Sequence, residues 1–202
     1  MSDPLYPTRS ASDRLSGGVL AGGEGRRFGG LDKGWIRYRG QAFVEHLVER
    51  LAPQVDEVLI SANRSLDRYQ ALGYPVLTDR VGAGPLAGLL RLLESANTPW
   101  LLSVPCDALD LPTDLAGQFR DLQRREGADV VVLTDDDGVH PTVSLTRTSL
   151  APDAAAFIAQ GGLSLQRWQS RHRVVQARRA GVLCNVNDAA ALDAMLAERA
   201  HG

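Results

Sequence analysis

Glycines and basic residues are concentrated in one stretch, from Gly17 to Gly34, which has the sequence GGVLAGGEGRRFGGLDKG. A short apolar run leads into glycines, which lack a Cβ and let backbone N–H groups approach an anion closely. Arg27 and Lys33 on the same stretch supply the positive charge that a polyphosphate requires. Lys33 is the single lysine of the chain, which favours a role for a compact, mobile charge; the alternative is a surface lysine placed by chance. The stretch therefore predicts a phosphate-binding loop.

The spacing within this stretch excludes two common nucleotide-binding loops. A P-loop requires Ser or Thr directly after its lysine, but Gly34 follows Lys33, so no hydroxyl is offered to a metal. A dinucleotide-binding fingerprint requires Gly-x-Gly-x-x-Gly, and counted from Gly23 its third glycine position holds Phe28.

The elements that must position this loop follow from the hydrophobic pattern. Apolar strands alternate with amphipathic helices, which predicts an α/β fold with a mostly parallel sheet. Residues 140–145 are expected to return beside residues 130–133 as one antiparallel strand. The other expected strands are 19–21, 58–60, 76–78, 100–104, 173–175 and 182–184. The expected helices are 43–51, 66–72, 85–93, 112–126, 151–160, 163–171 and 189–199.

Polar residues follow the expected strands at their carboxyl ends, where open α/β sheets bind ligands. These residues are Gly22, Ser61, Asn63, Asp79, Asp107, Asn185 and Asn187. Each is also an ordinary turn former, so turn chemistry is the alternative for every one. Asp107 follows an apolar strand, where a carboxylate can hold Mg²⁺ together with water and substrate phosphates; its alternative role is a helix N-cap. His140, before Pro141, suits either a structural or a functional role.

Length and composition describe an ordinary globular chain. Its 202 residues fit one domain, for which we expect a flexible N-terminal leader over 1–16 and a single domain over 17–202. The net charge of −2 and the lack of a run of about 20 apolar residues give no reason to expect a nucleic-acid or membrane partner. Two cysteines are too few for a disulfide framework, so we expect a reducing, cytoplasmic location.

The motifs together resemble a known family. Residues 20–23 (LAGG), 27–30 (RFGG) and 32–33 (DK) resemble the signature loop of the nucleotidyltransferase superfamily, and within it that of the molybdenum-cofactor guanylyltransferases, the MobA family. The segments 84–88 (GPLAG), 105–107 (PCD), 140–142 (HPT) and 185–187 (NVN) extend the similarity over nearly the whole chain. Ser61 and Glu24 depart from the pattern, since the family often has asparagine and a basic residue there.

The resemblance implies a Rossmann-like three-layer α/β/α fold of the nucleotide-diphospho-sugar transferase type, with one antiparallel strand. It implies transfer of GMP from GTP to the phosphate of molybdopterin or molybdenum cofactor, releasing pyrophosphate, with Mg²⁺ as cofactor. The implied GTP-binding residues are Leu20, Ala21, Gly22, Lys33, Ser61, Asp79 and Asp107. Lys33, Arg27 and Asp107 are the implied catalytic residues, Asp107 the metal ligand, and His140, Asn185 and Asn187 the acceptor-binding residues.

Two alternatives of different kinds stay open at this point. One is a cytidylyltransferase or sugar-phosphate nucleotidyltransferase, which would share the loop chemistry but differ in its base and acceptor pockets. The other is a non-catalytic nucleotide-binding or delivery protein, which would bind GTP without releasing pyrophosphate. The resemblance also implies proteins that insert molybdenum, or that accept the finished cofactor, as partners.

Overall fold

The computed structural model describes residues 10–21, 32–79, 84–181 and 183. Within these residues the chain forms a seven-stranded sheet in the order β5-β4-β1-β6-β8-β7-β9 and a separate two-stranded hairpin, β2-β3. The strands of the large sheet are β1 Leu15–Leu20, β4 Glu57–Ser61, β5 Val76–Leu77, β6 Trp100–Pro105, β7 Val130–Asp135, β8 Gly138–Arg147 and β9 Val174–Arg178.

The sheet is mostly parallel with one antiparallel strand, as predicted. β1 pairs in parallel with β4 and β6, β4 with β5, and β7 with β9, whereas β8 runs antiparallel to both β6 and β7. The parallel strands therefore all end at one edge of the sheet, which we call the carboxyl edge. Open α/β sheets bind their ligands at this edge.

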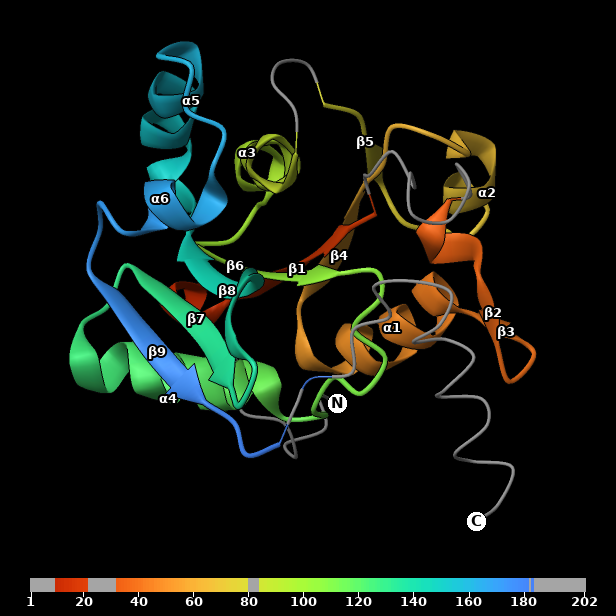
Figure 1. The fold of residues 1–202 in the computed structure, drawn as a ribbon, viewed down its shortest axis with the longest axis horizontal. Coiled ribbons are helices and arrows are strands. Elements are labelled where there is room, and N and C mark those ends of the chain that lie inside the picture. Colours follow the sequence, from red (N-terminus) through yellow and green to blue (C-terminus); the bar gives the residue numbers. More distant parts are fainter. Residues whose placement is uncertain (1–9, 22–31, 80–83, 182, 184–202) are drawn as a thin grey trace, which may run out of the picture.

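Helices cover both faces of the sheet (Figure 1), which confirms the predicted three-layer fold. They are α1 Phe43–Leu51, α2 Leu66–Gln70, α3 Pro85–Ser95, α4 Leu115–Glu126, α5 Ala151–Ala159 and α6 Leu165–Gln169. One apolar cluster packs α1, α2 and α4 against the sheet, and a second packs α3, α5 and α6 against the opposite face. The strands are hydrophobic on both faces because both are covered.

The N-terminal boundary differs from the expected one. β1 begins at Leu15, and both Leu15 and Ser16 are buried, so the sheet starts before residue 17. Asp13, in a short 3-10 helix (Ala11–Asp13), forms ion pairs with Arg120 and Arg124 of α4. Residues 10–16, the described part of the expected leader, therefore belong to the folded domain. Residues 15–16 start β1, and Asp13 holds the preceding segment against α4.

Other boundaries shift for local reasons. The hairpin β2 Arg37–Tyr38 and β3 Gln41–Ala42 was not expected; its two-residue turn places Arg39 and Gly40 at φ 53° and 83°, the positive values that tight hairpins require. α6 begins only at Leu165, because the Ser164 side chain accepts from the Arg167 N–H and caps the helix there. α4 begins at Leu115, three residues later than expected. The expected helix at 189–199 lies outside the described residues.

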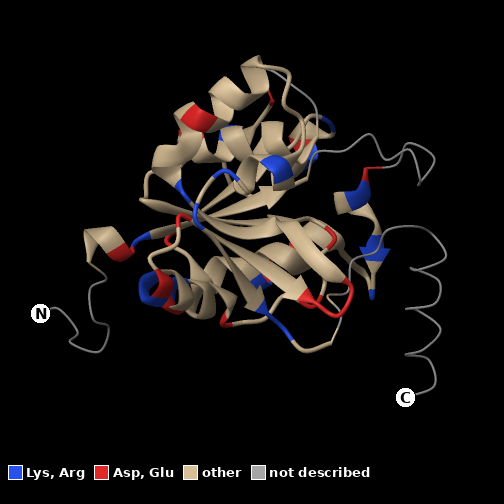
Figure 2. Cartoon of the chain, turned by 60° about the vertical axis from the view of Figure 1, so that its left-hand side comes forward, with Lys and Arg blue, Asp and Glu red and all other residues tan. Residues whose placement is uncertain are grey.

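Charged residues lie mainly on helices, loops and strand ends, whereas the middle of the sheet carries few (Figure 2). No helix among the described residues is both long enough and apolar enough to span a bilayer.

Candidate active site

Lys33 and Asp107 meet at the carboxyl edge of the sheet. Lys33 Nζ lies 2.5 Å from Asp107 Oδ2, although the two residues are 74 positions apart in the sequence. Their strands bring them together: β1 and β6 are parallel neighbours, and the Cys106 N–H donates to the Leu20 carbonyl just beyond their ends. The turn that carries Lys33 and the segment directly after β6 therefore meet at the carboxyl edge, as the transferase hypothesis requires.

The Asp107 carboxylate is largely buried, with 10% of its side chain exposed, against 26% for Lys33. A carboxylate in such surroundings requires an opposite charge, which Lys33 provides. The neighbouring thiol takes no such role, since burial, aided by the Asp107 charge, raises the pKa of Cys106. Cys106 thus packs as an apolar residue in the core.

Lys33 is held in a short 3-10 helix, Lys33–Trp35. The Asp32 side chain caps it by accepting from the Gly34 N–H. This cap fixes the backbone from which the lysine extends, so the ammonium reaches Asp107 from a defined direction.

A second polar cluster lies at the ends of β4 and β5. Ser61 Oγ donates to Asp79 Oδ1 at 3.2 Å, and Asn63 Nδ2 donates to Asp79 Oδ2 at 2.8 Å. The Asp79 N–H in turn donates to Asn63 Oδ1 at 2.9 Å. The structure thus brings the predicted residues Ser61 and Asp79 into one group, to which Asn63 belongs as well.

This cluster adjoins the loop after β1. The Ala21 N–H donates to the Ser61 carbonyl, which ties the predicted residues Leu20 and Ala21 to the end of β4. Helix α3 approaches closely at Gly88, where a Cβ would lie 2.9 Å from Ser61 Oγ and 3.0 Å from Leu20 Cδ2. Glycine suits this position because a side chain would displace Ser61 Oγ or Leu20 Cδ2.

A third group lies farther along the same edge, on the α4 face of β7 and β8. His140 Nε2 lies 2.7 Å from Asp135 Oδ2. Burial alone would raise the pKa of Asp135, but donation from the Leu183 N–H, from His140 and from the Asp137 N–H outweighs it and holds this pKa at about 2. Asp135 is therefore an ionised, buried carboxylate that orients the predicted acceptor residue His140.

An adjacent ion pair at this end was not predicted. Arg179, directly after β9, donates from Nη2 to Asp110 Oδ2 at 2.5 Å. Asp110 lies three residues beyond Asp107, so the pair connects the end of β9 to the loop after β6. Strand β9 was expected to end at residue 175, so Arg179 did not stand out as a strand-end residue, and its partner is 69 residues away in the sequence.

Four of the predicted site residues, Gly22, Arg27, Asn185 and Asn187, lie outside the described residues. The others fall into three groups along one edge: Lys33 with Asp107, Ser61 with Asp79 beside Leu20 and Ala21, and His140 with Asp135.

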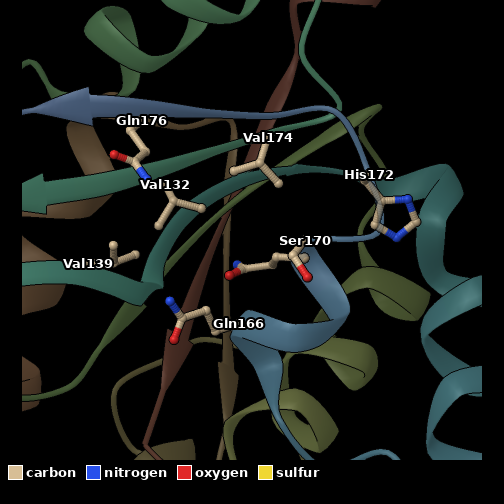
Figure 3. Close-up of a pocket in the computed structure, with 8 residues that line it drawn as sticks. Val132, Val139, Gln166, Ser170, His172, Val174 and Gln176 are labelled. Carbon is tan, nitrogen blue, oxygen red and sulfur yellow. The ribbon is translucent and has the colours of Figure 1, made fainter.

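A cavity of about 360 Å³ lies elsewhere, between α6 and strands β7, β8 and β9 (Figure 3). Valines from the three strands line it together with Gln166, Ser170 and His172. Val139 lines the cavity, whereas its neighbour His140 pairs with Asp135, because alternate residues of a strand point to opposite faces. Neither Lys33 nor Asp107 contributes to this cavity, so it is separate from the charged residues of the edge.

The described residues contain no group of three or more His, Cys, Asp or Glu side chains that could form a metal site by themselves. Asp107 nevertheless suits a hard cation, because only one of its two oxygens accepts from Lys33. Mg²⁺ commonly takes one or two carboxylates and completes its shell with water and substrate phosphates. Asp107 thus fits a cation that a bound triphosphate would share.

Solved structures share this sheet and its helical layers. A solved structure of molybdopterin-guanine dinucleotide biosynthesis protein A from Archaeoglobus fulgidus superposes with a TM-score of 0.74 over 93% of this chain and 100% of the other, at 18% identity. Rv0371c from Mycobacterium tuberculosis, solved in complex with manganese, superposes with a TM-score of 0.67 over 91% and 98%, at 16% identity. Both likenesses confirm the fold.

Residues 17–177 match the family model described as the MobA-like NTP transferase domain, and the chain belongs to this family. A molybdenum cofactor guanylyltransferase from Ralstonia nicotianae is 40% identical over 198 residues, which cover 92% of this chain and 97% of the relative. The resemblance found in the sequence is thereby confirmed, and the chain is a nucleotidyltransferase.

Proposed function

We propose that this enzyme transfers GMP from GTP to the terminal phosphate of molybdopterin or of its molybdenum form. The products are the guanine dinucleotide cofactor and pyrophosphate. The observation that carries the proposal is the convergence of Lys33 and Asp107 at the carboxyl edge, 2.5 Å apart. The close relative named molybdenum cofactor guanylyltransferase supports the choice of nucleotide and acceptor.

The reaction requires no general base on the enzyme. An oxygen of the acceptor phosphate, already anionic, attacks the α-phosphorus of GTP; the bond from that phosphorus to the bridging oxygen breaks, and pyrophosphate leaves with the electron pair. Lys33 neutralises charge that develops on the attacked phosphate, and Arg27 holds the outer phosphates. Catalysis of this kind depends on positioning and charge.

Asp107 would hold Mg²⁺, which supplies further neutralisation of the phosphate charge when bound. In the structure Lys33 and Asp107 neutralise each other. A triphosphate with its cation offers each of them a new opposite charge, the phosphates for Lys33 and the cation for Asp107. The ion pair therefore keeps the site neutral. When substrate binds, each charge loses its partner but gains another partner of the same sign, so the electrostatic cost of breaking the pair is small.

The group formed by Ser61, Asn63 and Asp79 is the proposed base site. Asp79 carries two acceptor oxygens held by Ser61 and Asn63, and a guanine edge presents adjacent N–H donors. Cytosine and uracil do not present the same pair of donors. This arrangement favours guanine over the alternative of a cytidylyltransferase.

The acceptor is proposed to lie toward β7 and β8. His140, oriented by Asp135, is placed to contact it, and Asn185 and Asn187 are proposed to do so from outside the described residues. The cytoplasmic location and the partners that deliver molybdenum or receive the cofactor stay predictions.

The first test is a thermal-shift panel with GTP, CTP, ATP and UTP, each with Mg²⁺. A ligand that binds the folded state raises its melting temperature, so we expect GTP to give the largest shift. The second test is pyrophosphate release from GTP when molybdopterin is supplied. A larger shift with CTP would favour the cytidylyltransferase alternative, and GTP binding without pyrophosphate release would favour the non-catalytic one.

A further inference from the structure

Helix α2 contacts the turn that carries Lys33. The hydroxyl of Tyr69, on α2, donates to Asp32 Oδ1 at 2.7 Å. The same oxygen accepts from the Gly34 N–H at 3.2 Å. Asp32 Oδ2 is buried and forms no hydrogen bond with the described residues. The orientation of the Asp32 carboxylate thus depends on the two donors to Oδ1, and Tyr69 is the one that comes from a distant part of the chain.

The packing around Tyr69 fits the turn closely. Tyr69 is completely buried, and its ring lies 5.0 Å from that of Trp35, the last residue of the Lys33 turn. The guanidinium of Arg68 lies 4.0 Å from the centre of the Trp35 ring, on which it stacks. A Cβ on Gly34 would lie only 2.3 Å from the Tyr69 oxygen. Gly34 therefore leaves the space that the Tyr69 hydroxyl occupies, which a side chain at position 34 would block.

Tyr69 acts only as a donor in this contact. Burial, together with the nearby Cys106 and Asp32, raises the pKa of Tyr69 far above its usual range. The hydroxyl is therefore protonated at neutral pH and donates to Asp32.

We propose that Tyr69 is a positioning residue that, through Asp32, fixes the turn from which Lys33 reaches the reacting phosphate. The inference rests on the proposed function of Lys33. Helix α2 also connects β4 to β5, the strands whose ends carry Ser61 and Asp79. The element that spans the proposed base site is thus hydrogen-bonded to the lysine turn, which sets the distance between base and phosphate contacts.

The test uses Tyr69→Phe, which removes the hydroxyl and keeps the buried ring. Its matched control is Tyr74→Phe, on the segment between α2 and β5, whose hydroxyl forms no hydrogen bond with any residue that the structure describes. A misplacement of about 1 Å can cost about a hundredfold in rate. We expect Tyr69→Phe to lower kcat for pyrophosphate release tenfold to a hundredfold at saturating GTP, with a smaller change in KM, and Tyr74→Phe to leave both near wild type.

Two further variants separate positioning from general stability. In a Lys33→Met background, Tyr69→Phe is expected to cause no additional loss of kcat, because residues that act through one group are not additive. Asp32→Asn, which weakens both hydrogen bonds by removing the charge, is expected to lower kcat in the same direction as Tyr69→Phe. Equal additional losses in both backgrounds would overturn the proposal.

Lys33 also permits a readout that needs no turnover. Because it is the single lysine, reductive ¹³C-methylation labels only Lys33 and the N-terminal amine. We expect the Lys33 resonance to move toward its unstructured position in Tyr69→Phe and to stay in place in Tyr74→Phe. An unchanged resonance in Tyr69→Phe would refute the positioning role. Absence of pyrophosphate release from the wild type would instead refute the proposed function, and the resonance would still decide the positioning role.

Discussion

Replacement of Lys33 by methionine tests the proposed chemistry most directly. Methionine retains a flexible stem of similar length but removes the ammonium, so the charge beside Asp107 is lost while the local packing volume is nearly kept. The variant therefore separates the electrostatic role of Lys33 from its contribution to packing.

The expected loss of activity follows from the geometry. Loss of one preorganised charge or donor at a reacting centre typically costs about 10²- to 10³-fold in kcat, or roughly 3–4 kcal/mol. Lys33 is placed for this role because its ammonium lies 2.5 Å from the carboxylate that is proposed to hold the cation. We expect kcat for pyrophosphate release to fall by this factor at saturating GTP and molybdopterin.

The expected loss of stability is much smaller. Breaking a fully buried ion pair costs roughly 3–5 kcal/mol, but 26% of the Lys33 side chain is exposed, so about 1–2 kcal/mol is a fitting estimate here. For a chain of this size this corresponds to a fall in melting temperature of roughly 2–8 °C. The fold should therefore persist at assay temperature.

Arg120→Met is the matched control. Arg120 is also a partly buried cation with a carboxylate partner, Asp13, but it stacks on Trp100 at the start of β6, at the opposite edge of the sheet. We expect Arg120→Met to lower the melting temperature at least as much as Lys33→Met and to leave kcat within about twofold of wild type. A Lys33→Met enzyme whose kcat stays within fivefold of wild type would refute the proposed role of Lys33.

Three further perturbations test other parts of the site. Gly34→Ala should lower both melting temperature and kcat, since the added Cβ would lie 2.3 Å from the Tyr69 oxygen; a stable and fully active variant would contradict the contact. Asp79→Ala should reduce the thermal shift with GTP more than that with CTP, and equal reductions would argue against Asp79 as a base contact. Asp135, whose pKa is lowered from 3.8 to about 2, stabilises the fold above the higher value and loses this contribution as the pH falls toward the lower one. Urea unfolding from pH 5 to pH 2 should therefore show a shallower fall in stability for Asp135→Asn than for wild type, and identical slopes would exclude this linkage.

The sequence by itself determined the fold class and the main candidates. The alternation of strands and helices predicted the mostly parallel sheet, and the return of residues 140–145 predicted its antiparallel strand. These signals are local, since hydrophobic periodicity and glycine content depend on neighbours in the chain. For the same reason Lys33 and Asp107 could be selected from their own segments, each after an apolar strand.

Only the tertiary structure decided which of these residues meet. Lys33 and Asp107 are 74 residues apart, Tyr69 and Asp32 are 37 apart, and Arg179 and Asp110 are 69 apart. Such contacts depend on strand order and helix packing, which cannot be read from the short segment around either residue. Strand order placed the ends of β1 and β6 side by side, and the packing of α2 placed the Tyr69 hydroxyl against Asp32 in the lysine turn.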